Sequence, residues 1–462
     1  MNAVAPVQEF ETRGQRLAAF ISTARGRTYP PDVLEAARKA FVDYLGVTFG
    51  SMNDAPVLAV SAAVRRWEAP GKSTVFGQYR TAPALAALVN GTSTHSQDYD
   101  DTHPMGAGHP SGPVWSASLA MAEHLEIDGP LLMSAYITGY EVMAKLGNGG
   151  APGGVGRTLQ RKGFHPTSIV GRTGAAASVS VLLGLTQHQV GSALGNVATT
   201  MGGLLGSFGS HSKPFHAGKA AMDGIMAAQY AAEGYEAAQT LYELEGGWLS
   251  AFIQDNSATV PTLDDFGRNW EILGNGFKLF ASCRATHAST ETARSLAEKV
   301  AGRAIGSVHV KTHSTALITA GKLFPKTPLE CKFSVPFCVA MGLRGYRLLP
   351  DDFVETTLAD TSVTELLSKI TVEPVPGQPP SEAHVEVMLE DGEVLRASTR
   401  IVKGHPDNPL TWDELQAKFE SMLERSLPSA DIATLFEAAK ACDDPHAFAT
   451  FRRLIGPREP RE

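Results

Sequence analysis

The chain contains few cysteines, and none has the spacing of a metal or redox site. Four cysteines occur among 462 residues: Cys283, Cys331, Cys338 and Cys442. No two of them form a Cys-x-x-Cys pair, so neither a zinc site nor a redox dithiol is predicted. The closely spaced thiolates that usually hold an iron–sulfur cluster are also missing. A low cysteine content is typical of a reducing compartment, and we predict a cytoplasmic protein.

The sequence also lacks long hydrophobic runs and an excess of basic residues. No run of about 18 apolar residues is present, and residues 1–15 have no apolar signal-peptide core, so neither a membrane span nor a leader is predicted. Asp and Glu number 48 against 40 Lys and Arg, which gives a formal net charge of −8. Nucleic-acid and acidic-membrane surfaces need clustered basic residues, so neither partner is predicted. A small anionic ligand remains compatible, because its site needs only local positive charge.

Helical periodicity dominates the first 260 residues. We predict helices over residues 30–50, 55–69, 81–97, 111–125, 129–147, 165–185 and 213–233. The last two of these are rich in Gly, Ala and Ser, which lets helices approach closely, so we expect them to be central and mutually buried. Residues 147–158 are glycine-rich but lack the spacing of a phosphate-binding loop, and we interpret them as a flexible loop.

The pattern changes after about residue 270. Residues 307–311 and 385–389 alternate polar and apolar side chains, and Asp391-Gly392 predicts a hairpin turn to a strand at 394–397. Several prolines between residues 374 and 380 predict an extended loop. Helical patterns return at 411–427 and 431–441.

These patterns predict a mostly α protein of two domains, as expected for a chain of this length. A large all-helical domain of residues 1–268 and 405–462 would carry an inserted, smaller α+β lid domain of residues 269–404. The cleft beside the insertion is the expected place for a small-molecule site.

The densest polar cluster runs from His95 to His109. It contains Asp98, Asp100, Asp101, Thr102 and His103 and lies between two predicted helices, where rigid elements can hold catalytic groups. An alternative is local capping, with Asp98 binding loop amides and Ser111 capping the next helix. A mixture of His and Asp can also bind a divalent metal, but no metal-binding spacing is present and no metal is predicted.

Three further clusters carry imidazoles and cations. His165 precedes one small-residue helix, and a neutral histidine there can act as acid or base. Lys213 precedes the other such helix, an unfavourable position for a cation unless an anion lies between them. The third cluster, Lys278 to His287, lies at the junction with the α+β segment. As lone residues these would more often be structural or solvated side chains.

Together the clusters fit removal of a proton next to a carboxylate. That proton is weakly acidic, so the dianionic intermediate must be stabilised by Lys, Arg or protonated His. A general base and a general acid complete the set, and each proton transfer contributes about 10²–10⁴-fold. A non-catalytic protein that binds a carboxylate metabolite is the alternative of a different class.

The same segments resemble the MmgE/PrpD family. The resemblance rests on residues 43–46 (Asp-Tyr-Leu-Gly), 90–112, 163–167 (Gly-Phe-His-Pro-Thr), 213–218 (Lys-Pro-Phe-His-Ala-Gly) and 278–287, in that order. Known members include 2-methylcitrate dehydratase, cis-aconitate decarboxylase and iminodisuccinate epimerase. The resemblance implies a large helical domain with an α+β lid, a homodimer, and no metal or organic cofactor.

It also implies site residues. The family's catalytic positions correspond to Asp98, Thr102, His109, His165, Lys213 and Lys278. We assign substrate contacts to His216, Cys283, Arg284 and His287. The two lysines are expected to bind carboxylates. His109 or His165 would remove the proton and the other would act as acid, while Asp98 and Thr102 would orient a histidine or a substrate hydroxyl.

We predict a cofactor-independent lyase of the dehydratase type, acting on a small di- or tricarboxylate such as 2-methylcitrate. An epimerase or isomerase of a dicarboxylate such as iminodisuccinate shares the first half-reaction and stays open. A decarboxylase of the cis-aconitate type is a further alternative. The family's decarboxylases resemble one another in carrying a histidine at the position of Cys283, which weighs against that reaction here.

Overall fold

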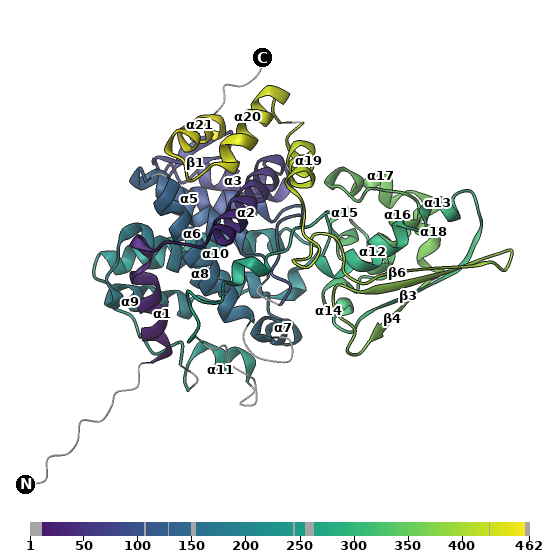
Figure 1. The fold of residues 1–462 in the computed structure, drawn as a ribbon, viewed down its shortest axis with the longest axis horizontal. Helices are drawn as coiled ribbons and strands as arrows, with labels where there is room; N and C mark the ends of the chain where they lie inside the picture. The colour runs from purple at the N-terminus through teal and green to yellow at the C-terminus, as the bar shows by residue number, and fades with distance from the viewer. Residues whose placement is uncertain are drawn as a thin grey trace, which may run out of the picture.

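Two groups of elements with separate hydrophobic cores build the molecule (Figure 1). The computed structural model describes residues 12–105, 108–127, 129–148, 154–243, 245–254, 263–424 and 426–457. Helices account for most of these residues, with two small sheets, so the predicted mostly α class is confirmed. None of the helices in these ranges is long and apolar enough to span a bilayer.

The first group is helical and forms the larger part of the molecule in Figure 1. Its main helices are α1 (Arg13–Ser22), α2 (Pro31–Gly50), α3 (Ala55–Arg65), α4 (Pro83–Thr94), α5 (Ser111–Leu125), α6 (Gly129–Asn148), α7 (Gly154–Arg161), α8 (Pro166–Leu183), α9 (Gln187–Thr199), α10 (Ser212–Ala232) and α11 (Trp248–Ile253). A proline opens α2, α4 and α8, where its missing N–H has no helical partner to lose. The predicted helices of this region are confirmed.

Two predictions in this region are wrong. A small hairpin of β1 (Ser73–Val75) and β2 (Tyr79–Thr81) lies between two of the predicted helices, so the domain predicted to be all helical contains two strands. The glycine-rich loop is wrong at its end, because α7 begins at Gly154; residues 149–153 of that prediction lie outside the described residues. The short helix α7 was not predicted because it begins in a glycine-rich stretch; its first residue, Gly154, has a φ of +72°.

The second group is an α+β unit. Its sheet has the order β4-β3-β5-β6, formed by β3 (Ile305–His313), β4 (Ile370–Val375), β5 (Ala383–Leu389) and β6 (Val394–Thr399). The predicted β5–β6 hairpin is confirmed, with Gly392 at a φ of +88° in its turn. The loop predicted from residue 374 is wrong in part, because Pro374 lies inside β4. Strand β4 is an edge strand, and an edge strand can accept a residue without an N–H.

Helices cover one face of this sheet. The contacts with the strands come from α12 (His287–Arg294) and α16 (Val335–Leu343), and α18 (Thr361–Leu367) packs against α16. The shorter helices α13 (Ala297–Val300), α14 (Ala316–Ala320), α15 (Pro328–Cys331) and α17 (Glu355–Leu358) complete the unit. Strand β5 shows the expected alternation, because Val385, Val387 and Leu389 are buried while the residues between them are more exposed.

The last helices return to the helical group. They are α19 (Trp412–Leu423), α20 (Ser429–Lys440) and α21 (Pro445–Ile455), and side chains such as Phe419 and Phe451 belong to the helical core. Helix α19 packs against α2. The chain thus leaves the helical core near Phe277 and rejoins it near Leu410. The domain limits at 268/269 and 404/405 stay a prediction.

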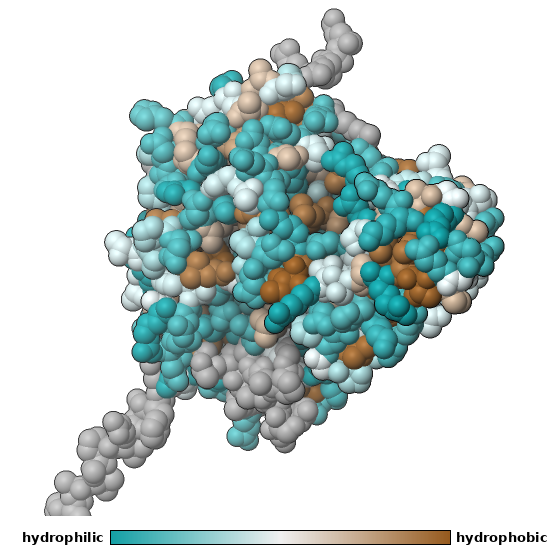
Figure 2. Space-filling model, turned by 45° about the vertical axis from the view of Figure 1, so that its right-hand side comes forward, coloured by the Kyte–Doolittle hydropathy of each residue, from teal (hydrophilic) through white to brown (hydrophobic). Residues whose placement is uncertain are grey.

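The small-residue helices are central, as predicted. Helix α10 packs against both α4 and α8. A Cβ added to Gly91 of α4 would lie 2.7 Å from the Cα of Gly218 in α10, so the two backbones touch. This contact places the amino-terminal end of α10 beside the loop that follows α4. The outer surface in Figure 2 is mainly hydrophilic, with separate hydrophobic patches.

We predict that Gly218→Ala destabilises the protein. Its new Cβ would meet the backbone of α4 at Leu88 and Thr92, and overpacking of this kind costs about 1–3 kcal/mol. Urea unfolding measures the change. Gly26→Ala is the control, since Gly26 is exposed with open space around its Cα. Equal stability of the two variants would contradict the close packing of α4 and α10.

Candidate active site

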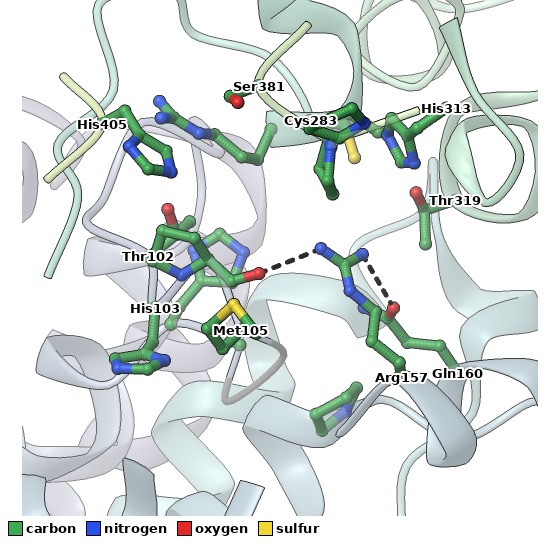
Figure 3. Close-up of a pocket in the computed structure, with 18 of the residues that line it drawn as sticks. Thr102, His103, Met105, Arg157, Gln160, Cys283, His313, Thr319, Ser381 and His405 are labelled. Carbon is green, nitrogen blue, oxygen red and sulfur yellow. Dashed lines mark hydrogen bonds between the residues drawn. The ribbon is translucent and has the colours of Figure 1, made fainter. Parts of the chain in front are cut away.

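A cavity of about 520 Å³ lies where the helical group meets the α+β unit. The helical group contributes the loop after α4, together with α7 and the first residues of α8 and α10. The α+β unit contributes Cys283, His313, Thr319 and Phe333, and residues 379–407 close a further side. Figure 3 shows Arg157, Cys283, His313 and Thr319 toward one end, with Thr102, His103 and His405 toward the other. The volume suits a small molecule.

Asp98 forms a buried charged cluster at the cavity with Lys213 and Lys278, which we call the Asp98 centre. Its backbone has a φ of +51°, an uncommon conformation for a residue other than glycine. Its Oδ1 accepts hydrogen bonds from the Nζ atoms of Lys213 (2.7 Å) and Lys278 (2.9 Å). Burial alone would raise the pKa of Asp98, but the two lysine charges outweigh burial and hold it well below its usual range. Lys213 lies in the first turn of α10, where a cation is unfavourable, and Asp98 is the anion that compensates its charge.

The neighbouring pair His95 and Asp100 has a defined proton arrangement. Lys213 Nζ also donates to His95 Nε2 at 2.9 Å, and because an ammonium cannot accept, that nitrogen carries no proton. The proton therefore sits on Nδ1, which donates to Asp100 Oδ2 at 2.8 Å. Burial lowers the pKa of His95 to about 3, in agreement with a neutral ring.

His109 lines the cavity beside this pair. Its Nδ1 lies 3.1 Å from Asp100 Oδ1, and its Nε2 lies 3.7 Å from Asp98 Oδ1. The 3.1 Å approach of Asp100 Oδ1 favours the proton on Nδ1, although the two atoms do not form a hydrogen bond of good geometry, and the Nε2 lone pair is then available. Burial lowers the pKa of His109, so the ring is neutral at pH 7 and able to accept a proton.

His165 is the residue before α8 and also lines the cavity. Its backbone N–H donates to Gly203, and its Nδ1 lies 2.9 Å from Nδ1 of His216. Burial lowers the pKa of His165 well below its usual range and that of His216 to about 4. His216 itself does not line the cavity, so the predicted substrate contact is corrected: it holds the ring of His165.

Thr102 joins the acidic loop to the junction segment. Its backbone exchanges two hydrogen bonds of 2.8 Å with Gly276. Its Oγ1 is buried at the cavity wall, and no described residue forms a hydrogen bond with it, which leaves a hydroxyl for a ligand.

Only some residues of the junction segment, Lys278 to His287, line the cavity. Cys283 and Arg284 line the cavity, whereas Lys278 and His287 do not. Lys278 acts on the site through Asp98, and His287 Nε2 faces the Ser282 carbonyl at 3.2 Å, so their expected direct substrate contacts are corrected. Burial raises the pKa of the Cys283 thiol, so Cys283 is not an activated nucleophile.

Arg284 presents an unsatisfied cation. Its Nη1 donates to the Phe277 carbonyl at 3.3 Å, while Nη2 is buried and has no hydrogen-bond partner among the described residues. Burial lowers its pKa to about 10, which still leaves the guanidinium charged. A buried charge of this kind is costly unless an anion accompanies it, so an anionic ligand is expected.

Asp101 binds the first residue of α5. Asp101 accepts hydrogen bonds from the Ser111 backbone (3.2 Å), the Ser111 hydroxyl (2.6 Å) and Asn275 (2.9 Å). Burial raises the pKa of Asp101 to about 7. The predicted capping is therefore wrong in both parts, because Ser111 is the first residue of α5 and donates to Asp101, and Asp98 Oδ1 accepts from two lysines.

The Asp43 motif supports the loop from behind. Asp43 Oδ1 accepts from Lys418 Nζ at 2.6 Å, and the same ammonium donates to the Tyr99 carbonyl at 2.7 Å. Both charged side chains are buried. A residue of the returning helix α19 thus fixes the loop that carries Asp98.

Sequence reasoning missed several cavity residues. Arg157, His313, Arg400 and His405 line the cavity and were not singled out. His95 and Asp100, which lie behind the lining residues, were seen in the acidic cluster but given no role. Arg157 lies in the segment interpreted as a loop, and His313 is an isolated residue at the end of a strand. Neither had a motif that could have marked it.

Four potential metal ligands lie close together. The donor atoms of His95, Asp98, Asp100 and His109 are within 4.8 Å of one another. Two of these residues already accept from Lys213, and Asp98 also accepts from Lys278. A divalent cation would have to displace these ammonium groups, so the donor set does not fit a metal in this arrangement.

We predict that Asp98→Asn destabilises the fold by about 3–5 kcal/mol, because it leaves two buried ammonium groups without their shared anion. Urea unfolding measures the loss. The control is Asp264→Asn, which removes an exposed partner of Arg16 and should cost less than about 1 kcal/mol. A small effect at both positions would contradict the paired charge centre.

Comparisons with known proteins agree with this arrangement. Residues 15–261 match the MmgE/PrpD N-terminal domain, and residues 280–443 match the MmgE/PrpD C-terminal domain. The chain is 29% identical over 446 residues to cis-aconitate decarboxylase of Homo sapiens, covering 93% of this chain and 91% of that protein. It is 26% identical over 450 residues to the Mus musculus enzyme of the same name (92% and 89% covered). A cis-aconitate decarboxylase-like protein of Aspergillus oryzae is 25% identical over 444 residues (89% and 91% covered). The chain belongs to the MmgE/PrpD family.

Proposed function

We propose that this protein is a cofactor-independent lyase of the dehydratase type that acts on a small di- or tricarboxylate. The observation that carries the proposal is His109. Its Nδ1 lies 3.1 Å from Asp100 Oδ1, which favours the proton there, and its Nε2 lies 3.7 Å from Asp98 Oδ1 in a side chain that lines the cavity. A neutral imidazole oriented by a carboxylate is suited to remove a proton from carbon.

Charge balance supports a polyanionic substrate. At the Asp98 centre, the ammonium charges of Lys213 and Lys278 are balanced by the carboxylates of Asp98 and Asp100, and the imidazoles are neutral. Arg157 and Arg284 line the cavity as well. Among the described residues, no carboxylate lies within ion-pair distance of either guanidinium. Each of these two guanidinium groups would fit a substrate carboxylate, although Glu382 and Asp407 also line the cavity.

The reaction follows from these positions. His109 Nε2 accepts the proton on the carbon next to a carboxylate, and the electron pair moves onto that carboxylate as an aci-carboxylate. Lys213, at the cavity wall, stabilises the added charge. The electron pair then returns to form the C=C bond as the C–O bond at the adjacent carbon breaks.

His165 is the proposed acid. When His216 donates to its Nδ1, the His165 proton resides on Nε2, from which it can protonate the leaving hydroxide to give water. Thr102 would hold the substrate hydroxyl through its unpartnered Oγ1. The roles of the two histidines follow from Asp100, which contacts His109 and not His165.

Decarboxylation is the second candidate, because the similar human, mouse and fungal proteins carry the name cis-aconitate decarboxylase or a name derived from it. In that reaction a C–C bond to a carboxylate breaks, carbon dioxide leaves, and a histidine protonates the carbon. The same cations would bind the substrate. The thiol of Cys283 stands where the family's decarboxylases are expected to carry a histidine, which weighs against decarboxylation.

Proton NMR of the purified protein in D₂O tests the proposal, with 2-methylcitrate, citrate, cis-aconitate and iminodisuccinate as substrates. We expect loss of water from a hydroxylated substrate. Lys213→Ala should lower turnover by at least about 10²-fold, because it removes the charge that stabilises the intermediate. The control is Lys219→Ala, a half-exposed lysine of the same helix. Carbon dioxide release from cis-aconitate alone would replace dehydration by the second candidate, and no reaction or exchange with any of the four would contradict both.

The pH dependence tests the base. Burial lowers the pKa of His109 below its usual value near 6.5, so the neutral form persists as the pH falls through 6.5. We therefore expect kcat/KM to be constant from pH 7.5 to pH 6.5 and to fall only at lower pH. A decline already complete above pH 6.5 would contradict His109 as the base. The experiment needs a buffer series of constant ionic strength, because substrate binding is electrostatic.

A further inference from the structure

The cavity holds a second group of polar side chains away from the Asp98 centre. We propose that Arg157 and His313 form a subsite for a second carboxylate of the substrate, separate from the carboxylate next to the reacting carbon. This inference rests on the proposed function for the identity of the ligand, and it assigns the subsite that selects polycarboxylates.

Arg157 projects from α7 into the cavity (Figure 3). Its Nη2 donates to the Pro104 carbonyl at 3.0 Å, and its Nη1 makes a long contact of 3.4 Å with Gln160 Oε1. A guanidinium has five N–H groups, so donors remain for a ligand. These two oxygens are uncharged, so they orient the guanidinium of Arg157 without cancelling its charge. The planar arrangement of its N–H donors matches the two oxygens of a carboxylate.

His313 completes the subsite from the α+β unit. It is the last residue of β3, and its side chain is buried with no hydrogen-bond partner for Nε2 in the part of the chain that the structure describes. Its Nδ1 lies 2.8 Å from the Thr315 hydroxyl, and when that hydroxyl donates, the His313 proton resides on Nε2. Burial and then the charge of Arg157 lower the pKa of His313 to about 4, so it offers a neutral N–H donor. Thr319 of α14 lines the same end of the cavity.

The subsite draws on both parts of the molecule. Arg157 belongs to the helical group, whereas His313 and Thr319 belong to the α+β unit, and α7 contacts α14. A carboxylate bound here therefore links the two parts across the cavity, while the Asp98 centre holds the reacting end of the substrate. A monocarboxylate can occupy only one of these places, which gives a physical basis for selectivity.

Binding of propane-1,2,3-tricarboxylate to the full-length protein tests this inference without requiring turnover. Titration calorimetry would compare the wild type with Arg157→Gln. We expect at least about tenfold weaker binding in the variant, because charge-assisted hydrogen bonds to the carboxylate are lost. Arg161→Gln is the matched control, since Arg161 is an exposed arginine of the same helix that donates to Thr158.

A second variant keeps the test valid if Arg157→Gln fails to fold. His313→Asn removes the opposite donor and should weaken binding at least about threefold, with an unchanged melting temperature as the check on folding. Equal affinity in Arg157→Gln and wild type, or no binding to the wild type, would overturn the subsite. Weaker binding in both variants together with no reaction in D₂O would keep the subsite and reject the lyase, so the two proposals fail separately.

Discussion

The shared hydrogen bonding of Asp98 Oδ1 to Lys213 and Lys278 is the interaction on which the site depends. It brings together a loop after α4, the first turn of α10 and the segment that leads into the α+β unit. The carboxylate reaches this place only because the Asp98 backbone adopts a φ of +51°, a conformation that costs about 1–3 kcal/mol. The contact of α4 with α10 through Gly91 and the buried Lys418 behind the loop hold it there.

The chemistry follows from this charge centre. Lys213 fixes the tautomer of His95, His95 and His109 share Asp100, and burial keeps both rings neutral. The lysine and aspartate charges cancel within the centre, so the attraction for an anion comes from the arginines around the rest of the cavity. The neutral base His109 lies beside two lysines whose charges are already balanced. Negative charge can therefore develop on a substrate carboxylate there without a large rearrangement of the surrounding groups.

Much of this could be predicted from the sequence, and the failures have physical reasons. Helical periodicity and the Asp391-Gly392 turn report local geometry, so the main helices and the β5–β6 hairpin were predictable. Strand β4 was missed because Pro374 signals a loop unless the strand is known to lie at a sheet edge. Closeness in sequence identified the clusters, but it does not tell in which direction each side chain points. His216 and His287 were therefore expected at the cavity, although neither lines it. Arg157 and His313 meet only through tertiary packing, which no local pattern records.

The central claim is that His109 is a neutral base whose Nδ1 proton is held by Asp100. Nitrogen-15 NMR of histidine-labelled protein at pH 7 tests it most directly, with His109→Gln used to assign the signal. The account predicts one protonated nitrogen, Nδ1, and an unprotonated Nε2 for His109, and a change in that signal in Asp100→Asn. A doubly protonated imidazolium at His109, or a proton on Nε2 in place of Nδ1, would contradict it.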